Sequence, residues 1–475
     1  MARLQRVLDD APVPSLDAYL AAGGGKGLEA ARAVEPVAVI EVLEASGLRG
    51  RGGAGFPTGT KWRTVAGLGG AEPATVVVNA AEGEPGTFKD RTLVRRNPYR
   101  VLEGALVAAH AVGADRALVG LTSSSTTERT RIEAAIAELR AAGWEQEVAL
   151  GVFDGSDRYL TGEETALLEV SVGRPPFPRV APPYRAGQEQ VGDDPTEEAG
   201  TELADAEGTT GAPSTLVNNV ETLANVPAIV ERGPDWFRSA GTTDSPGTIV
   251  CTVSGRTQQA GVGEYELGTP LRQVLTELGG GPLGARIVAV LSGTANPFLP
   301  GDALDAPLSW EGLAAAGGGL GSAGFIVIDD EIDIVAVAHG VSRFLAVESC
   351  GQCTPCKQDG LGIAARLDDA RRSQPVDLDE LRVMADRITD GARCYLARQH
   401  QDVVRSLLER FPDALAAHLD GRAAGAEPFP IVPLHDIVDG QAVLALEQLE
   451  VSADWQVGAD SGASPAERLD VRLRA

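Results

Sequence analysis

The chain has 475 residues, a net charge of −26 and 43% hydrophobic residues. This length allows two to four domains with ample cores. The negative charge excludes the basic surface that nucleic acid requires, and no apolar run is long enough for direct membrane insertion. The first residues do not resemble a signal peptide, so we expect a cytoplasmic location, with a peripheral position on a membrane complex as the alternative.

A glycine-rich stretch follows the first predicted helices, which lie around residues 15–20 and 36–45. Residues 47–62 combine many glycines with two arginines and a lysine. Glycine lets the backbone approach a ligand closely, and its N–H groups can then bind phosphate. The stretch is neither a Walker A nor a GxGxxG motif. Alone it therefore predicts either an anion-binding loop or a flexible one.

Strands and helices then alternate in a way that is typical of a parallel sheet with crossover helices. The predicted elements are a strand at 75–78, a helix at 101–112, a strand at 117–121, a helix at 127–142 and a strand at 148–153. Polar residues 79–91 follow the first strand, and ligands bind at the carboxyl edge of such sheets. Glu163 and Glu164 open a further helix, where the helix dipole alone could explain them.

Beyond an acidic, glycine- and proline-punctuated loop at 186–212, order resumes at residues 217–222 and continues as a helix to Ile229. A β-rich region follows between residues 245 and 330. Its predicted elements are strands at 248–253, 264–267, 287–291 and 325–328, with a helix at 270–278. Two strands, a helix and further strands in so short a span predict a β-grasp module.

Three cysteines at C-x2-C-x2-C spacing follow a predicted helix that begins near Ile334. A tight turn with Cys350, Cys353 and Cys356 suits a 4Fe–4S cluster, whose irons each bind one thiolate. Cys394 is the one cysteine downstream and would be the fourth ligand, between predicted helices at 378–390 and 399–410. A zinc site or a disulfide pair are the alternatives, but this spacing favours iron–sulfur. Thiolate ligands also indicate a reducing compartment.

Five motifs carry a resemblance to a known family. They are GLRGRGGAGFPTG-x-KW, N-A-x-E-G-EPGT-x-KDR, GEETALLE, NNVETLANVP and ESCGQCTPC, in this order between about residues 45 and 410. With them the chain resembles the NADH-binding, FMN-carrying flavoprotein subunit of respiratory complex I. Related diaphorase subunits serve NAD-linked hydrogenases and formate dehydrogenases. The resemblance implies a Rossmann-like α/β FMN domain, a ubiquitin-like β-grasp domain and a helical bundle holding the cluster.

We accordingly expect four regions. Residues 1–240 form the FMN- and NADH-binding domain, with the N-terminal helices and acidic loop 186–212. Residues 245–330 form the β-grasp domain, and residues 332–420 the helical 4Fe–4S domain. Residues 421–475 are a C-terminal extension with no readable motif.

The resemblance also implies which residues bind the cofactors. FMN would contact Gly50, Arg51, Gly52, Lys61, Asn79, Glu82, Gly83, Tyr159, Gly162, Glu163, Val217, Asn218, Asn219 and Thr222. NADH would lie over the flavin and contact Gly53, Ala54, Phe56, Lys61, Glu84 and Glu164. No catalytic side chain is expected, because hydride transfer is the chemistry of the cofactors themselves.

The implied function is NADH dehydrogenase activity. Hydride passes from NADH to FMN, and single electrons then pass to the 4Fe–4S cluster and on to a partner. That partner would be a 2Fe–2S or ferredoxin-like redox subunit, or a larger redox complex. The alternative is an electron-relay or scaffold subunit with weakened flavin or NADH binding. Two departures from the family support that alternative, namely alanine for the usual aspartate at Ala81 and Thr64 where a large apolar residue is usual. The acidic stretch 188–207 and the tail after residue 427 look like additions and suggest a divergent paralogue. Replacing Ala81 with aspartate is then expected to tighten FMN binding.

Overall fold

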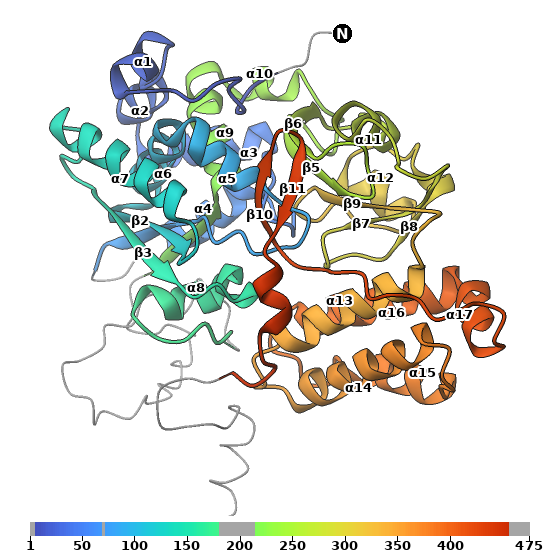
Figure 1. Cartoon of the computed structure of the whole chain (residues 1–475). Coiled ribbons are helices and arrows are strands. Elements are labelled where there is room, and N and C mark those ends of the chain that lie inside the picture. The colour runs from blue at the N-terminus through green and yellow to red at the C-terminus, as the bar shows by residue number, and fades with distance from the viewer. Residues whose placement is uncertain (1–4, 69–71, 180–213, 456–475) are drawn as a thin grey trace, which may run out of the picture. The chain divides into compact units, whose positions relative to one another are not determined.

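A computed structural model of the chain describes residues 5–68, 72–179 and 214–455 (Figure 1). These residues form two compact units. The first comprises residues up to Glu82, Lys89–Val250 and Glu264–Gly268, and the second comprises Gly83–Phe88, Cys251–Gly263 and the chain from Thr269 onward. The predicted acidic loop at 186–212 and residues 456–475 of the extension lie outside the described residues.

A four-stranded parallel sheet organises the first unit, as the sequence predicts. Its strand order is β3-β2-β1-β4. In the register, Val78 of β1 lies beside Val119 of β2, and Val77 lies beside Val217 of β4. These valines are buried, because a sheet covered on both faces needs apolar side chains on both. The strands are β1 (Ala74–Asn79), β2 (Ala114–Thr122), β3 (Ala149–Gly155) and β4 (Thr215–Asn219).

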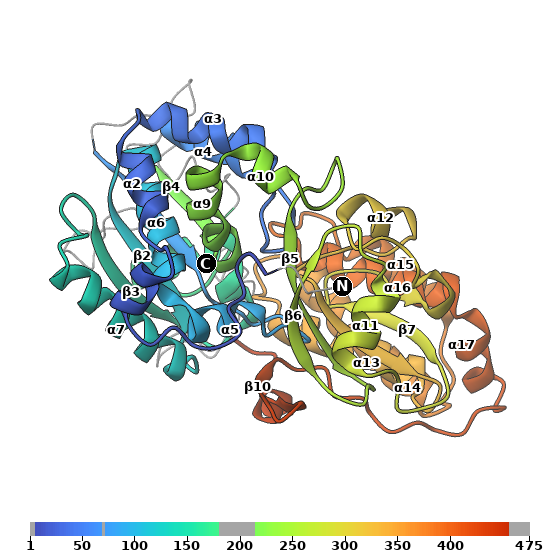
Figure 2. The same ribbon diagram turned by 90° about the horizontal axis from the view of Figure 1, so that it is seen from above.

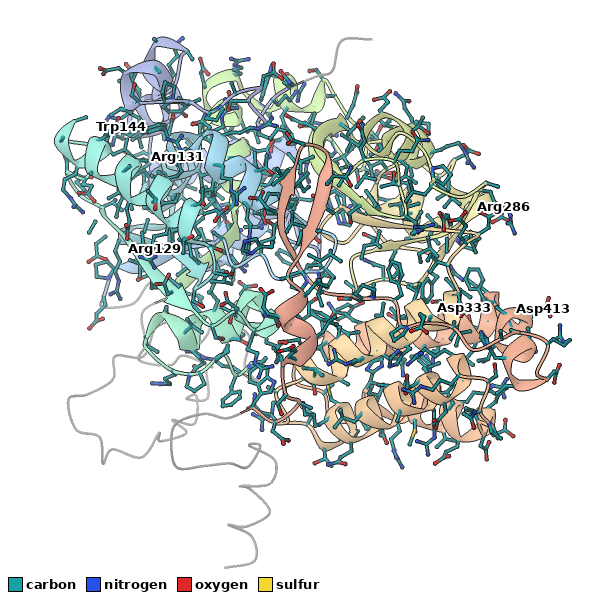
Figure 3. The ribbon with its side chains drawn as sticks, viewed as in Figure 1. Arg129, Arg131, Trp144, Arg286, Asp333 and Asp413 are labelled. Atoms are coloured by element: carbon teal, nitrogen blue, oxygen red, sulfur yellow. The ribbon has the colours of Figure 1, made fainter. Side chains whose placement is uncertain are left out.

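Helices cover both faces of this sheet (Figures 1 and 2). Helices α6 and α7 lie on one side and α8 lies on the other, and α2 and α9 pack beside α6. Arg129 of α7, labelled in Figure 3, ties this helix to Asp154 of β3 by an ion pair. The helices are α1 (Leu16–Ala21), α2 (Lys26–Arg32), α3 (Pro36–Ser46), α4 (Thr58–Gly67), α5 (Lys89–Arg96), α6 (Pro98–Val112), α7 (Thr126–Ala141), α8 (Glu164–Ser171), α9 (Val220–Arg232) and α10 (Pro234–Arg238).

A five-stranded mixed sheet opens the second unit, in the order β6-β5-β9-β7-β8. Strand β9 runs parallel to β5 and antiparallel to β7. Helix α11 buries Leu271, Val274 and Leu278 along one face, the spacing that an amphipathic helix requires. The elements are β5 (Thr248–Gly255), β6 (Gly261–Glu266), α11 (Leu271–Gly279), β7 (Ile287–Ser292), β8 (Leu299–Pro300), α12 (Trp310–Ala315) and β9 (Gly324–Asp329).

Packed helices complete the second unit. Helix α13 is buried along nearly its whole length and packs against α14 and α16. Asp333, labelled in Figure 3, caps α13 by accepting from the Val335 and Ala336 N–H groups and lies 2.7 Å from His418 Nε2. The elements are α13 (Ile334–Glu348), α14 (Thr354–Arg371), α15 (Leu378–Arg387), α16 (Leu396–Arg410), α17 (Pro412–Leu419), β10 (Leu434–Val438) and β11 (Gln441–Leu444).

The sequence did not predict several of the helices, namely α2, α4, α5, α10, α12 and α17. Helix α5 reads KDRTLVRR, which is too polar to show an apolar face, yet six of its eight residues are buried. Tertiary contacts stabilise such a segment more than its own helix propensity does. Among the described residues, none of the helices combines the length and apolarity needed to cross a membrane.

Candidate functional site

The glycine-rich stretch forms a closed loop between α3 and α4. The Gly50 N–H donates to the Phe56 carbonyl over 2.8 Å, and Arg49 Nε donates to the Gly55 carbonyl over 2.8 Å. Gly53 and Gly55 have φ angles of 132° and 64°, which favour glycine. Phe56 is 54% exposed at the end of the loop, so its ring is accessible to a ligand.

Arg51 anchors this loop from inside the protein. Its side chain is only 1% exposed, and its guanidinium donates to the carbonyls of Arg49, Pro246 and Thr248. Its backbone N–H donates to Thr222 Oγ1 over 2.8 Å. Burial lowers the pKa of Arg51 to about 10, against the opposing charge of Glu221. The guanidinium therefore holds the loop in place and does not present its charge to a ligand.

Lys61 and the residues around it connect α4 to the carboxyl end of β4. Lys61 Nζ pairs with Glu164 and donates to the Val217 carbonyl over 2.7 Å. The buried Trp62 indole donates to Asn218 Oδ1 over 2.7 Å. Lys61, Glu164, Val217 and Asn218 were all predicted to lie together, and the structure brings them together. Trp62, which orients Asn218, was not predicted as a site residue.

The turn after β1 approaches the 3₁₀ helix η1 (Tyr159–Gly162) very closely. Asn79 Nδ2 donates to the Gly162 carbonyl over 2.8 Å. A Cβ atom added at Gly162 would lie only 2.7 Å from the Ala81 carbonyl oxygen. Tyr159, in the same 3₁₀ helix, is half-buried. The close backbone packing therefore leaves no room for a side chain at residue 162.

This contact gives a first prediction. Replacing Gly162 with alanine should push η1 away from the turn after β1 and cost about 1–3 kcal/mol of stability. FMN content after purification, measured by flavin fluorescence, should fall. Gly67→Ala is the matched control, because a Cβ at Gly67 meets nothing within 4 Å. Unchanged FMN content in the Gly162 variant would contradict the role of this contact.

Glu82 caps helix α5. Its carboxylate accepts from the N–H groups of Lys89, Asp90 and Arg91 over 2.9–3.1 Å. Burial, together with the charge of Asp90, raises the pKa of Glu82 to about 7, although Lys89 and the backbone N–H groups act in the opposite direction. Glu82 therefore shapes the predicted site by fixing α5.

A buried charge network lies next to this cap. Asn219 Nδ2 donates to Asp90, and Lys89 Nζ lies 2.8 Å from Asp90 and 3.0 Å from Glu221. Burial alone would lower the pKa of Lys89, but Asp90, Glu221 and Glu82 raise it overall. A Cβ at Gly52 would lie 3.2 Å from the Asn219 side chain, so the glycine loop passes directly over this network.

Glu163 is a helix cap as well. Its Oε2 accepts from Thr165 Oγ1 over 2.6 Å and from the Ala166 N–H over 2.8 Å, and burial raises its pKa. A purely structural role at the start of this helix was the simpler alternative at the sequence level, and the geometry favours it. Gly83 and Glu84 belong to the second unit, where Glu84 Oε1 accepts from the Thr294 N–H and hydroxyl.

The cysteine turn lies between α13 and α14, and the segment before α16 reaches back to it. Gln352 Nε2 lies 3.4 Å from Cys350 Sγ, and Arg393 donates to Gln352 Oε1 over 3.0 Å. Arg393 precedes Cys394, so this chain of contacts holds Cys394 beside the turn. Gln352 stands in the motif ESCGQCTPC but was not predicted as a site residue, and Arg393 was missed as well. Cys251 lies apart from this group in β5, fully buried.

The four thiols influence one another electrostatically. Burial raises the pKa of the Cys356 thiol, and Cys394, Cys353 and Cys350 raise it further. Among the residues that the structure describes, no group of three or more His, Cys, Asp or Glu side chains is placed to hold a single metal ion. Thiols on a 4Fe–4S cluster bind separate irons and so stand farther apart than the ligands of one zinc. The four thiol donors, three of them at C-x2-C-x2-C spacing in the sequence, are the donor set that a cluster requires.

Comparisons with known proteins match two regions of this chain. A family model described as Nuo51 FMN-binding domain matches residues 43–228, and one described as NADH-ubiquinone oxidoreductase-F iron-sulfur binding region matches residues 336–418. The chain is 37% identical to the second F-type subunit of the NADH-quinone oxidoreductase of Rhizobium meliloti (strain 1021), with 86% of this chain and 95% of the relative covered.

Two further matches come from hydrogenases. The chain is 34% identical to the HndC subunit of the NADP-reducing hydrogenase of Solidesulfovibrio fructosivorans, with 87% of this chain and 82% of that protein covered. A crystal structure of an NAD+-reducing NiFe-hydrogenase in the H2-reduced state matches with a TM-score of 0.74 and 34% identity. This match covers 88% of this chain and 67% of that one.

Proposed function

Because the chain belongs to the family of NADH-quinone oxidoreductase F-type subunits and their hydrogenase relatives, we propose how its residues serve that family's activity. It is an NADH-oxidising flavoprotein subunit with FMN and a 4Fe–4S cluster. When bound, FMN would supply hydride acceptance from NADH, and the cluster would supply one-electron transfer to a partner. The observation that carries the proposal is that one chain retains both the loop with Lys61 and a group of four thiols.

For the flavin, we propose that the chain supplies a backbone cradle. Gly52, Gly53 and Ala54 offer main-chain N–H groups, which suit a phosphate. Gly50 would support this cradle by closing the loop, since its own N–H donates to the Phe56 carbonyl. Lys61, Asn79, Tyr159, Gly162, Val217, Asn218, Asn219 and Thr222 stand around the same sheet edge, as do the capping residues Glu82 and Glu163. Phe56 would stack on the adenine of NADH. Gly83, Glu84 and Glu164 complete the proposed contacts.

For the cluster, we propose Cys350, Cys353, Cys356 and Cys394 as the ligands. The mutual effects among these thiols, and the link from Arg393 through Gln352 to Cys350, support this set. Three regions would follow the family pattern: an FMN domain over residues 1–240, a β-grasp domain over 245–330 and a helical 4Fe–4S domain over 332–420. The mixed sheet with α11 and the packed helices α13–α17 support the latter two.

We also infer that the chain is one subunit of a larger redox assembly. The relatives carry subunit names, so a partner with a 2Fe–2S or ferredoxin-like centre would take the electrons. Thiolate ligands require reducing conditions, which supports a cytoplasmic location, or a peripheral one on a membrane complex.

This proposal predicts a preference for NADH over NADPH. Carboxylates near the dinucleotide, Glu84 and Glu164, would repel the additional 2′-phosphate. Anaerobically purified protein should contain FMN by fluorescence and reduce ferricyanide with NADH, with a higher kcat/KM than with NADPH. Comparable kcat/KM values would contradict the preference. Iron without FMN, and no NADH oxidation, would instead favour the alternative of a relay or scaffold subunit.

A further inference from the structure

The described part of the C-terminal extension, residues 421–455, lies directly on the cluster-side helices of the second unit. The Ala426 N–H donates to the Arg371 carbonyl, and Arg371 Nη1 donates to the Ala426 carbonyl, both over 2.7 Å. A Cβ atom at Gly340 of α13 would lie 2.3 Å from the Phe429 carbonyl oxygen. The extension backbone therefore crosses α13 so closely that residue 340 has no room for a side chain.

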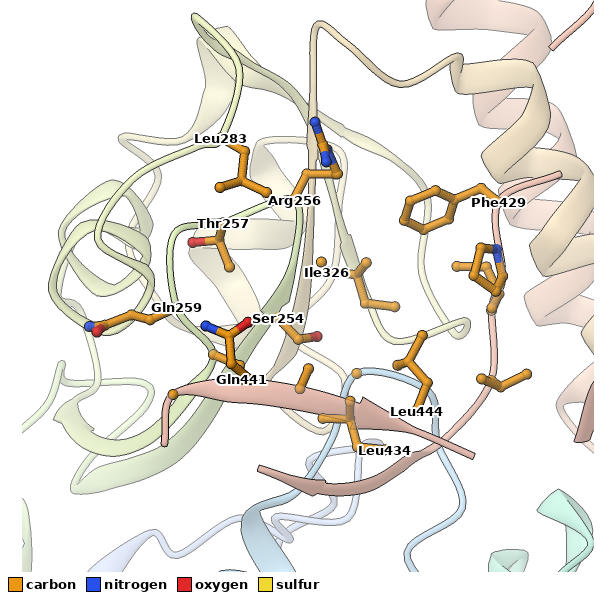
Figure 4. A pocket seen from close by; sticks show the side chains of 18 residues that line it. Ser254, Arg256, Thr257, Gln259, Leu283, Ile326, Phe429, Leu434, Gln441 and Leu444 are labelled. Atoms are coloured by element: carbon orange, nitrogen blue, oxygen red, sulfur yellow. The ribbon is translucent and has the colours of Figure 1, made fainter. Parts of the chain in front are cut away.

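The middle of the extension packs on the mixed sheet of the same unit. Ile431, Val432 and Leu434 are buried, and the Ala260 N–H donates to the Gly440 carbonyl over 2.7 Å. A cavity of about 290 Å³ remains beneath it, and Figure 4 shows side chains of the sheet and of the extension around this space. The extension is thus attached along its length, although its packing is incomplete.

The last described residue of the extension, Trp455, reaches the end of α13. Its side chain is 4% exposed, and its indole Nε1 donates to the Val347 carbonyl over 3.1 Å. Arg343, one turn earlier in α13, donates to the Leu449 carbonyl. Val347 lies three residues before Cys350, so Trp455 contacts the helix end from which the cysteine turn begins.

Lys357 binds the same helix end. Its ammonium donates to the carbonyls of Ala346 and Ser349 over 2.9 and 2.8 Å, and lies 3.5 Å from the Val347 oxygen. The indole of Trp455 and the ammonium of Lys357 therefore meet at one carbonyl. Lys357 directly follows Cys356, and Val347 lies three residues before Cys350. The Val347 carbonyl therefore connects Trp455 to the start and to the end of the cysteine turn.

The thiols differ in their exposure. Cys350 and Cys356 are buried, whereas Cys353 and Cys394 are half-buried. The extension lies outside both matched family regions, the second of which ends at residue 418.

We propose that the C-terminal extension is a strap across the cluster-binding turn and that Trp455 is the positioning residue that closes it. By holding the Val347 carbonyl, Trp455 fixes the helix end before Cys350 and keeps water and small solutes away from the buried side of the cluster. This inference rests on the cluster ligands proposed above.

Loss of Trp455 should act through local opening of the strap. The rate of iron release should be proportional to the fraction of molecules in which the strap is locally open. Removing one hydrogen bond should increase that fraction by roughly two- to twelvefold. Trp455→Phe, which keeps a ring but lacks the N–H donor, should therefore release iron faster by about this factor. Trp455→Ala, which also loses the ring, should release iron faster still.

The test uses the full-length holoprotein, purified and reduced under anoxic conditions. The measurements are the rate of iron transfer to a water-soluble ferrous chelator, the EPR spectrum of the reduced protein, and flavin content as an internal reference. Leu275→Ala in α11 is the matched control, because it removes a buried side chain from the same unit and Leu275 does not line the cavity beneath the strap. It should lower the melting temperature and leave the EPR spectrum and the rate of iron release unchanged.

Four results are decisive. Faster release and an altered EPR spectrum in both Trp455 variants, but not in Leu275→Ala, would support the strap. Equal rates in wild type and both Trp455 variants would overturn it, and so would equal acceleration in Leu275→Ala. Wild-type protein that binds no iron under any condition would instead overturn the cluster proposal itself, so the two failures are distinguishable.

Discussion

Replacing Cys394 with serine is expected to remove or convert the cluster as severely as replacing Cys353. A 4Fe–4S cluster needs one thiolate for each iron, so loss of any ligand leaves one iron without its preferred donor. The effect should be large, because iron content falls from about four per chain towards three or none. The measurements are iron content and the EPR spectrum of anaerobically purified variants.

Cys251→Ser is the matched control for this experiment. Cys251 is also a buried cysteine, but it lies in β5 and is not among the thiols that shift the pKa of Cys356. Its replacement should leave iron content unchanged. If the Cys394 variant retained the iron content of wild type, the four-cysteine assignment would be wrong. If the Cys251 variant lost iron, β5 would have to be part of the cluster site.

Much of the fold could be predicted from the sequence because its signals are local. The alternation of strands and helices between residues 74 and 155 predicted a parallel sheet, and the structure confirms it. The C-x2-C-x2-C spacing likewise located the cysteine turn. In both cases the pattern that allows the prediction lies within a short stretch of sequence.

The supporting residues could not be predicted, because their partners are distant in sequence. Trp62 contacts Asn218 from 156 positions away, and Arg393 contacts Gln352 from 41 positions away. A motif also does not distinguish a ligand from a cap. Arg51, Glu82 and Glu163 stand in motifs of the family, yet their side chains bind the protein's own backbone. Only tertiary structure shows where those groups point.

Ala81 shows how tertiary structure changes an expectation from the sequence. The family resemblance suggested that alanine here removes a contact to the flavin and that aspartate would restore it. In the structure, Ala81 is buried in an apolar cluster with Val77, Leu167, Leu168 and Val217. Its backbone N–H already donates to Asn79 Oδ1 over 3.2 Å. An aspartate side chain would therefore enter apolar surroundings.

Ala81→Asp is consequently expected to destabilise the first unit and to lower FMN content. A buried polar group without a partner costs about 1–3 kcal/mol, and more when it is charged. Burial also raises the pKa of a carboxyl group. The unfolded chain, with an ordinary aspartate pKa of about 4, then releases its proton at a lower pH than the folded chain. The variant should thus lose stability as the pH rises above about 4, until the raised pKa of the folded state is passed.

The measurements are urea unfolding at several pH values and FMN content by fluorescence. Ala81→Asn is the control for charge, since its amide has nearly the same shape and does not titrate; its stability loss relative to wild type should not vary with pH. If Ala81→Asp instead bound FMN more tightly with unchanged stability, a hydrogen-bond donor must reach this position. The apolar cluster around Ala81 would then have to open far enough for the aspartate to reach that donor.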